Sequence, residues 1–480
     1  MATDYKTPGV YIEEIPHLPP SIASVETAIP AFIGYTEKAQ WKEKDDLFEK
    51  PWRISSLLEY EQYYGYPDPE KADALFVVFS AEGVNGRVDE TKRSKFLMHY
   101  SMQMFFANGG GPCWIVSVGG YTAGLDQQQL LKGLAEVEKI DEVTLLLFPD
   151  ALNLPSASAY YDVHTKAILQ CKLLKDRFVI MDVFHDAANL KNWQLDIFVE
   201  GDTTKGLRNI VSGTTDELKY AAVYFPKLYT NVDYNYKTNP ADQAKDNDAA
   251  IKLVNGPAGT ATLADLIAGN NQLYFQGKAA VAEIQMLLPA SPAIAGIYAQ
   301  VDNSRGVWKA PANVNVVNAI RPEYLITHQE QMGLNVDTTA GKSVNVIRAF
   351  PGRGPAIVWG ARTLAGNDNE WRYVPVRRFF NMVEESIENA VNQFVFEPND
   401  ENTWVRVKAM IQIYLERIWR DGALMGATAQ EAFFVHIGLG QTMTEVDIWE
   451  GRMIIQIGIA AVRPAEFIIL RFMHKMLAES

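Results

Sequence analysis

The sequence predicts a multidomain α+β protein, and three observations support this prediction. The chain has 480 residues with a hydrophobic content of 48%, which exceeds the usual size of one domain and is enough for several packed cores. Continuous apolar strands alternate with helical segments in the middle of the chain. The last third carries two long amphipathic helices followed by extended segments. We therefore expect roughly two to four domains.

The N-terminal part contains a strand-forming stretch, residues 9–15, with prolines on both sides. Val10, Tyr11 and Ile12 lie at its centre, and side chains of this kind favour extended structure. At about 3.3 Å per residue, such a stretch makes a strand of roughly 23 Å. A strand of this length is not stable alone and needs a sheet to pair with.

The elements that follow are predicted from apolar periodicity and from the positions of glycine and proline. In chain order they are a strand at 28–36, a surface loop at 37–50, a helix ending at Gly65, a helix and glycine turn within 99–112, a strand at 113–118, a strand within 143–151, a helix at 157–175, and strands within 177–184 and 217–230. Buried strands separated by helices are typical of a parallel or mixed sheet covered on both faces. The polar stretch 231–248 is predicted to be an exposed excursion.

The last third predicts two helices and two strands. Apolar residues from Phe380 to Phe394 recur at three- and four-residue steps, and the same spacing runs from Trp404 to a stop at Gly422. The stretches 451–462 and 466–477 then predict two strands joined at a proline, although the second stretch also allows a helical end.

Composition excludes several classes of function. The net charge is −14, and residues 402–480 hold eight basic and eight acidic residues, so the acidic excess lies in the rest of the chain. No basic stripe indicates nucleic-acid binding. No apolar run approaches the roughly 18 residues of a membrane span, and the predicted helices lack a basic polar face, so we expect no direct membrane insertion. Cys113, Cys171 and the absence of a signal-peptide layout predict synthesis in the cytoplasm.

The best candidates for catalysis are Asp182, His185 and Asp186, which follow a predicted buried strand. Strand ends hold catalytic groups in many α/β enzymes, so a hydrolytic base or a metal site here is the enzymatic alternative. We favour a capping role, because Asp and His at strand ends commonly bond to local backbone. The sequence also contains no Gly-x-Ser-x-Gly and no His-Glu-x-x-His.

Two glycine motifs do not fit a nucleotide site. The stretch TAGKS (339–343) contains Gly-Lys-Ser, but Val336 stands where a phosphate-binding loop needs glycine. The cluster NGGGPCW follows a helix and precedes a strand, which is the reverse of a dinucleotide-binding turn. We predict no cofactor, and with seven scattered histidines we predict no metal site.

Five segments, taken in order, carry a resemblance to a known family: TPGVYIEEI, FFANGGGPCWIVSV, YAAVYFPKL, SPAIAGIYAQVDNSRGVWKAPAN, and NEWRYVPVRRFFNMVEESIENAVNQFVFEPND with the helix after it. The chain resembles the tail sheath proteins of contractile phage tails and of related contractile injection systems. The match is densest from Ser291 to Glu466, and GVWKAPAN and FVFEPND are its most specific pieces. Residues 37–100 and 231–290 are less diagnostic.

The resemblance implies how the domains are arranged. It implies an N-terminal arm at 1–24, an inserted outer α/β region at 25–355 with a mixed sheet covered by helices, an inner domain at 356–465, and a C-terminal arm at 466–480. In this family the inner domain is assembled from the N-terminal segment and the C-terminal third.

The resemblance also implies that both arms add strands to the inner sheet of neighbouring subunits. The residues expected to pair in this way are Val10, Tyr11, Ile12, Ile15, Phe467, Ile469, Leu470 and Phe472. Main-chain hydrogen bonds give such pairing its affinity. The stretch 16–24, if extended at about 3.1 Å per residue, spans roughly 28 Å, which is enough to reach an adjacent subunit. Pairing of these strands within their own chain is the alternative.

The implied function is that of a structural subunit, not an enzyme. It polymerises into a helical stack of hexameric rings around an inner tube, and contraction drives the tube through a target envelope. The implied partners are further copies of the chain, the tube protein, and baseplate and terminator or cap proteins, in a phage tail or a tail-like particle that stays in the cytoplasm or is released. A ring adaptor that caps a tube is the alternative.

We further hypothesise that one polar helix face contacts the tube through Lys408, Glu416, Arg417 and Arg420. Glu416 and Arg420 are also spaced as an i,i+4 ion pair, so an ordinary solvated face is the alternative.

Overall fold

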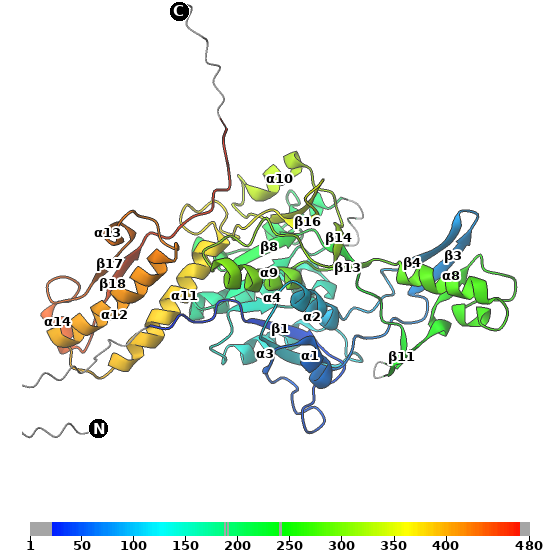
Figure 1. Ribbon diagram of the computed structural model, residues 1–480, viewed down its shortest axis with the longest axis horizontal. Helices are drawn as coiled ribbons and strands as arrows, with labels where there is room; N and C mark the ends of the chain where they lie inside the picture. The colour runs from blue at the N-terminus through cyan, green and yellow to red at the C-terminus, as the bar shows by residue number, and fades with distance from the viewer. Residues whose placement is uncertain (1–21, 187–188, 190–191, 240–241, 471–480) are drawn as a thin grey trace, which may run out of the picture. The chain divides into compact units, whose positions relative to one another are not determined.

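The computed structural model describes residues 22–186, 189, 192–239 and 242–470 (Figure 1). Within them the chain forms two compact units. The smaller unit comprises residues 22–25 and Val383–Val462, and the larger unit comprises Glu26–Met382 and residues 463–470. These units concern one isolated chain, and the domain boundaries expected above stay a prediction.

The larger unit is built on an eight-stranded sheet with the strand order β16-β15-β8-β7-β6-β1-β5-β2. Its strands are β1 (Pro30–Tyr35), β2 (Trp52–Ile54), β5 (Cys113–Gly119), β6 (Leu145–Leu147), β7 (Phe178–Asp182), β8 (Ala221–Phe225), β15 (Asn345–Phe350) and β16 (Gly354–Val358). The six central strands run parallel, and β2 and β16 are antiparallel to their neighbours. The predicted mixed sheet is confirmed.

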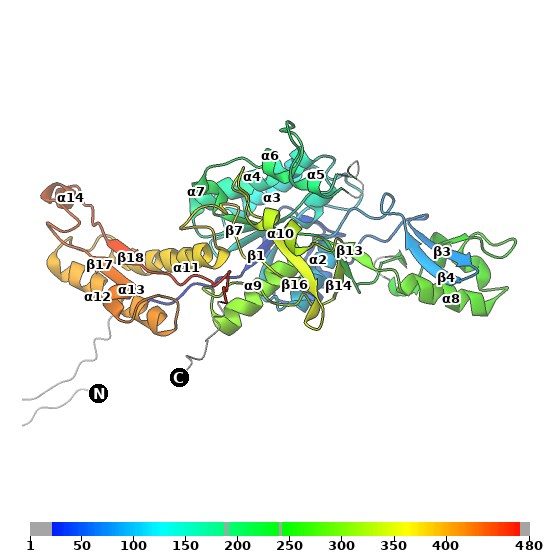
Figure 2. The ribbon, with the colours of Figure 1, turned by 90° about the horizontal axis from the view of Figure 1, so that it is seen from above.

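The sheet is covered on both faces because its strands are apolar on both sides. Phe32 belongs to one core cluster, whereas Ala31 and Ile33 on the same strand belong to another. Helices α2 (Met98–Ala107) and α9 (Ser291–Arg305) complete the first core, and α3 (Gln127–Val137) and α4 (Ala157–Leu174) complete the second. Figure 2 shows the two helix pairs on opposite sides of β1.

The helix boundaries follow from local chemistry. Helix α1 (Leu57–Tyr64) ends at Gly65, as predicted, where the backbone takes a φ of 83°. Helix α4 begins after Ser156, whose hydroxyl accepts a hydrogen bond from the backbone N–H of Ala159 at 3.2 Å. The remaining helices of the larger unit are α5 (Gln194–Ile197), α6 (Leu207–Ile210), α7 (Thr215–Leu218), α8 (Asn271–Ala282) and α10 (His328–Asn335), with 3-10 turns η1 (Pro149–Asn153), η3 (Asp248–Ala250) and η4 (Leu263–Leu266).

Three smaller sheets complete the larger unit. Their strands are β3 (Leu75–Ser80), β4 (Gly83–Val88) and β12 (Lys252–Val254) in one, β9 (Leu228–Thr230), β13 (Met286–Leu288) and β14 (Ala319–Pro322) in the second, and β10 (Lys237–Asn239) and β11 (Asp242–Asp246) in the third. Helix α8 packs on β3 and β4.

The predicted exposed excursion at 231–248 is only partly correct. Val232, Tyr234 and Asn235 are buried. The polar Asn235 tolerates burial because its side-chain N–H donates to the carbonyl of Pro67 at 2.7 Å. The polar composition of this stretch therefore wrongly predicted that Val232, Tyr234 and Asn235 are exposed.

The smaller unit contains the two predicted amphipathic helices. Helix α11 (Val374–Val391) begins in the larger unit and ends in the smaller one, followed by η5 (Asn392–Phe394). Helix α12 (Glu401–Arg420) begins after Asp400, whose carboxylate accepts from the backbone N–H of Thr403 at 2.9 Å, and it is followed by Gly422 as predicted. The short helices α13 (Ala429–Ala432) and α14 (Glu445–Trp449) follow.

The strands of the smaller unit are β17 (Phe433–His436) and β18 (Gln456–Ile459), which form an antiparallel pair. The prediction of a strand at 451–462 is confirmed in part by β18. Residues 466–470 form neither strand nor helix in this single chain, and residues 471–477 lie outside the described part, so the second predicted strand stays a prediction. A lone extended segment has no ladder of hydrogen bonds to stabilise it.

A buried carboxylate connects three elements of the larger unit. One oxygen of Asp150 accepts from the backbone N–H groups of Leu97 and Met98 at 2.5 and 3.1 Å, at the start of α2. The other oxygen accepts from the N–H of Tyr35 at 2.6 Å, at the end of β1. Burial raises the pKa of Asp150 to about 7. The carboxylate satisfies backbone donors that the strand and helix leave unpaired.

We predict that Asp150→Ala strongly destabilises the protein, because it leaves three buried N–H groups without an acceptor. The expected loss in the free energy of unfolding is about 3–5 kcal/mol, measured by urea denaturation. Asp150→Asn keeps one oxygen acceptor, so its loss in the free energy of unfolding is expected to be smaller than that of Asp150→Ala. The exposed Asp141→Ala is the control and should cost less than about 0.5 kcal/mol. Equal midpoints for the Asp150 and Asp141 variants would contradict this prediction.

Candidate functional site

The strand-end residue Asp182 caps a helix. One of its carboxylate oxygens accepts from the backbone N–H groups of Ala290 and Ser291 at 2.8 and 3.0 Å, at the start of α9. Burial raises the pKa of Asp182 to about 6. Asp182 thus has the predicted capping role, but the backbone that it caps is 108 positions away rather than local, and the residue connects β7 to α9.

His185 has a separate partner. Its Nδ1 lies 2.7 Å from a carboxylate oxygen of Asp196, and the other oxygen of Asp196 accepts from the backbone N–H of Asp186 at 3.1 Å. His164 is also structural, because its Nδ1 lies 2.9 Å from the carbonyl of Tyr160 and burial lowers its pKa to about 4. The candidate residues are thus used to hold backbone and neighbouring side chains in place.

The Gly-Lys-Ser stretch turns its side chains inward. Lys342 Nζ donates to the carbonyl of Arg208 at 2.6 Å, and Ser343 Oγ donates to the carbonyl of Asn335 at 2.6 Å. Arg208 in turn forms an ion pair with Asp337 at 3.2 Å. A lysine and a hydroxyl that are engaged in this way are not presented to a phosphate. The glycine cluster is packed against its own helix. A Cβ on Gly110 would lie 2.6 Å from the ring of Phe105, so the cluster forms the predicted tight turn.

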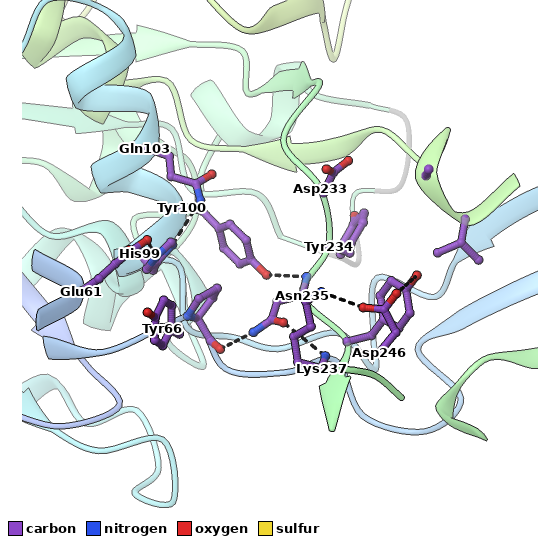
Figure 3. Close-up of a pocket in the computed structure, with 14 residues that line it drawn as sticks. Glu61, Tyr66, His99, Tyr100, Gln103, Asp233, Tyr234, Asn235, Lys237 and Asp246 are labelled. Carbon is purple, nitrogen blue, oxygen red and sulfur yellow. Dashed lines mark hydrogen bonds and ion pairs between the residues drawn. The ribbon is translucent and has the colours of Figure 1, made fainter. Parts of the chain in front are cut away.

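A polar cavity of about 550 Å³ lies beside α2 (Figure 3). Its walls include His99, which lies 3.1 Å from a Glu61 carboxylate oxygen, and Lys237, whose Nζ lies 2.7 Å from Asp246. The hydroxyl of Tyr100 accepts from the backbone N–H of Asn235 at 3.1 Å. His99 and Glu61, and Lys237 and Asp246, therefore pair with each other in the cavity wall.

In the described residues, no cluster of three or more His, Cys, Asp or Glu side chains is arranged to hold a metal ion. Across the same residues, no helix combines the length and the apolar character that crossing a bilayer requires.

The C-terminal arm residues within the described part are exposed. Phe467, Ile469 and Leu470 are 67%, 77% and 71% exposed, and Ile468 is 79% exposed. The other predicted arm residues, Val10, Tyr11, Ile12, Ile15 and Phe472, lie outside the described residues. A run of apolar side chains with this exposure is typical of a segment that is buried by association.

The sheet of the smaller unit is open. It consists of β17 and β18, and in the described residues no third strand pairs with Gln456–Ile459. Beyond β18 the backbone bonds to the segment after α12, where the N–H of Met425 donates to the carbonyl of Ala460 at 2.7 Å. Open strand edges carry unpaired N–H and C=O groups that another strand can use.

The four predicted tube-facing residues lie on α12 but are not equivalent. Arg420 forms an ion pair with Glu416. Arg417 is exposed, and its Nη2 donates to the carbonyl of Ile22 at 3.4 Å and to Ser24 Oγ at 3.3 Å. Lys408 is half-buried. The ion pair matches the solvated-face alternative, and the tube contact stays a prediction.

The sequence analysis missed one prominent site, a buried ion pair between Arg362 and Glu466 at 2.6 Å. The two residues are 104 positions apart, and no local pattern links them. The only signal was a charged residue directly before an apolar segment.

Comparisons with known proteins complete the assignment. A model of the phage tail sheath C-terminal domain family matches residues 366–474. The tail sheath protein of Vibrio phage KVP40 is 28% identical over 136 residues, which cover 27% of this chain and 19% of that protein. The match thus spans about a fifth of that relative's length.

Two solved structures match nearly the whole chain. A chain in the contracted sheath complex of an extracellular contractile injection system, PVC, is 29% identical, with a TM-score of 0.63 and 99% coverage of both chains. A chain in the baseplate of the anti-feeding prophage is 30% identical, with a TM-score of 0.64 and coverage of 98% of this chain and 100% of the other.

The fold and the comparisons define a class of structural protein, the tail sheath subunit. The chain belongs to the sheath proteins of contractile phage tails and injection systems. Its place is in a phage tail or a tail-like particle.

Because Asp182 caps α9, we predict that Asp182→Ala lowers the free energy of unfolding by about 2 kcal/mol. Asp182→Asn, which keeps a side-chain acceptor, should lose less. Thermal or urea unfolding of purified monomer measures the effect, with the exposed Glu200→Ala as the control. A stability equal to the control would rule out the capping role.

Proposed function

We propose that the chain polymerises with copies of itself into a helical stack of hexameric rings around an inner tube. Contraction of this stack drives the tube through a target envelope. The observation that carries the proposal is the exposed apolar segment Phe467–Leu470, which no element of the same chain covers in the described residues.

The arms join the copies by strand addition. The exposed edge at Gln456–Ile459 offers main-chain groups to an incoming strand, and a neighbour's residues 9–15 or 466–480 supply it. Identical subunits linked head to tail make heterologous contacts, which close into rings or continue as helices. Joining of this kind keeps each subunit attached to the next while the array changes shape.

Contraction needs no nucleotide. A strained extended array passes to one with more buried contact between subunits, which is a change between two packings of the same parts. The Gly-Lys-Ser stretch, which is engaged inside the larger unit, supports this view because it is not presented to a phosphate.

The remaining partners follow from the same function. The tube protein contacts the polar face of α12, with Lys408 and Arg420 as its cations and Glu416 beside them. Arg417 also holds residues 22–24 of the smaller unit through Ile22 and Ser24. Baseplate and terminator proteins bind the two ends of the stack, and the subunit is made in the cytoplasm and binds no nucleic acid.

A ring adaptor that caps a tube is the second candidate. Electron microscopy of purified protein separates the two. Sheath subunits form hollow ridged cylinders, whereas an adaptor forms single rings only.

We predict that deleting residues 1–15 abolishes cylinder formation while the monomer keeps its melting temperature. The double variant Val10→Asp with Ile12→Asp should have the same effect, because charges at alternate positions prevent burial of the strand. Glu13→Gln with Glu14→Gln is the matched control on the same stretch and should form cylinders. Cylinders of normal length from the deletion variant would refute the arm mechanism.

We predict that Lys408→Glu and Arg420→Glu each weaken binding to assembled tubes by about tenfold, since reversing an exposed charge in an interface turns attraction into repulsion. Co-sedimentation with the tube protein measures the effect, which should shrink in high salt. Arg406→Glu is the control, because it reverses an exposed charge on the same helix that, like Arg420, takes part in an ion pair (with Glu397 at 3.1 Å) but is not among the predicted contact residues. Unchanged binding by all three variants would assign this face to solvent.

A further inference from the structure

A charge pair with a buried arginine holds the chain to the larger unit directly before the exposed segment Phe467–Leu470. Arg362 Nε lies 2.9 Å from one carboxylate oxygen of Glu466, and Arg362 Nη2 lies 2.6 Å from the other. Two parallel N–H···O bonds of this kind fix orientation as well as distance. The Arg362 side chain is only 3% exposed.

The pair is completed by neutral groups. Asn335 Nδ2 donates to one oxygen of Glu466 at 2.7 Å, and the hydroxyl of Tyr373 donates to the other at 3.0 Å. A further Arg362 nitrogen donates to the carbonyl of Gly366 at 3.2 Å. Burial alone would raise the pKa of Glu466, but the hydrogen bonds and charge of Arg362 outweigh it and the pKa is lowered.

The contacts stop directly after this point. Upstream, Arg463 donates to the carbonyl of Asn369 at 2.9 Å. Downstream, Phe467 and its neighbours up to Leu470 are between 67% and 79% exposed. Fixed and free parts of the chain therefore meet at a single residue, Glu466.

We propose that Arg362 and Glu466 are positioning residues that fix where, and in which direction, the C-terminal segment leaves the larger unit toward a second copy of the chain. This proposal rests on the proposed function, which supplies the second copy. A segment that departs from a fixed point has less freedom to lose on pairing, so it pairs at lower subunit concentration. The same pair also transmits force from the C-terminal segment to the larger unit through its two parallel hydrogen bonds.

The first part of the test uses the full-length monomer. Cysteines at Ile468 and at Lys132, an exposed position on α3, are spin-labelled, while Cys113 and Cys171 are buried and do not react. The wild-type background should give a narrow distribution of label-to-label distances. Glu466→Gln should broaden it several-fold without a change in near-UV circular dichroism, because it removes the charge and one acceptor but leaves the carbonyl contacts of Arg362.

Arg362→Lys is the second variant, since it keeps the charge but loses the two-pronged geometry, and it should broaden the distribution less than Glu466→Gln. Glu136→Gln, which breaks the exposed ion pair with Lys139, is the matched control and should leave the distribution unchanged. Narrow distributions in both anchor variants would overturn the proposal.

The second part measures assembly. The concentration needed for cylinder formation should rise about tenfold in Glu466→Gln, as expected when an arm must be ordered on binding. A broadened distribution with an unchanged assembly threshold would overturn the positioning role. Failure of the wild-type chain to assemble would instead count against the proposed function. The distance measurement on the monomer tests the positioning role without assembly, so the two failures can be told apart.

Discussion

The six parallel strands at the centre of the larger unit are apolar on both faces. The rest of that unit is arranged to cover both faces. Parallel strands require crossover connections, and helices on both sides both make the connections and cover the sheet. The strand ends then leave backbone donors in an apolar interior. Asp150 and Asp182 accept hydrogen bonds from backbone N–H groups at the starts of α2 and α9, so Asp182, which the sequence offered as a catalytic candidate, is part of the framework.

The smaller unit follows a different principle. Its core is one face of two helices with the two-stranded sheet against α12. Several large apolar side chains on it are exposed, among them Phe396 on a left-handed backbone (φ of 72°) and Trp449 at 79%. A bulky residue in that conformation is strained and persists where the surroundings require it. Exposed apolar side chains and an open sheet edge suit this unit to association.

The sequence predicted those features that arise from nearby residues. Apolar periodicity and the glycines at 65 and 422 located helices α1, α4, α11 and α12, and the apolar runs located β1, β5, β7 and β8. It did not predict the contacts between distant segments. Glu466 meets Arg362 across 104 positions, and Asp150 meets the start of α2 more than 50 positions away. The stretch around Asn235 was misjudged because a buried amide with a carbonyl partner has the same composition as an exposed one.

The open two-stranded sheet has a consequence for the life of a free subunit. A sheet of two strands is marginally stable by itself, and such parts of a fold open locally more often than a closed core does. A newly made copy therefore exposes the open edge of the β17–β18 sheet to other copies of the chain. Assembly onto an existing polymer would cover this edge soon after synthesis. Free subunits that accumulate without such a polymer would aggregate through the same edge.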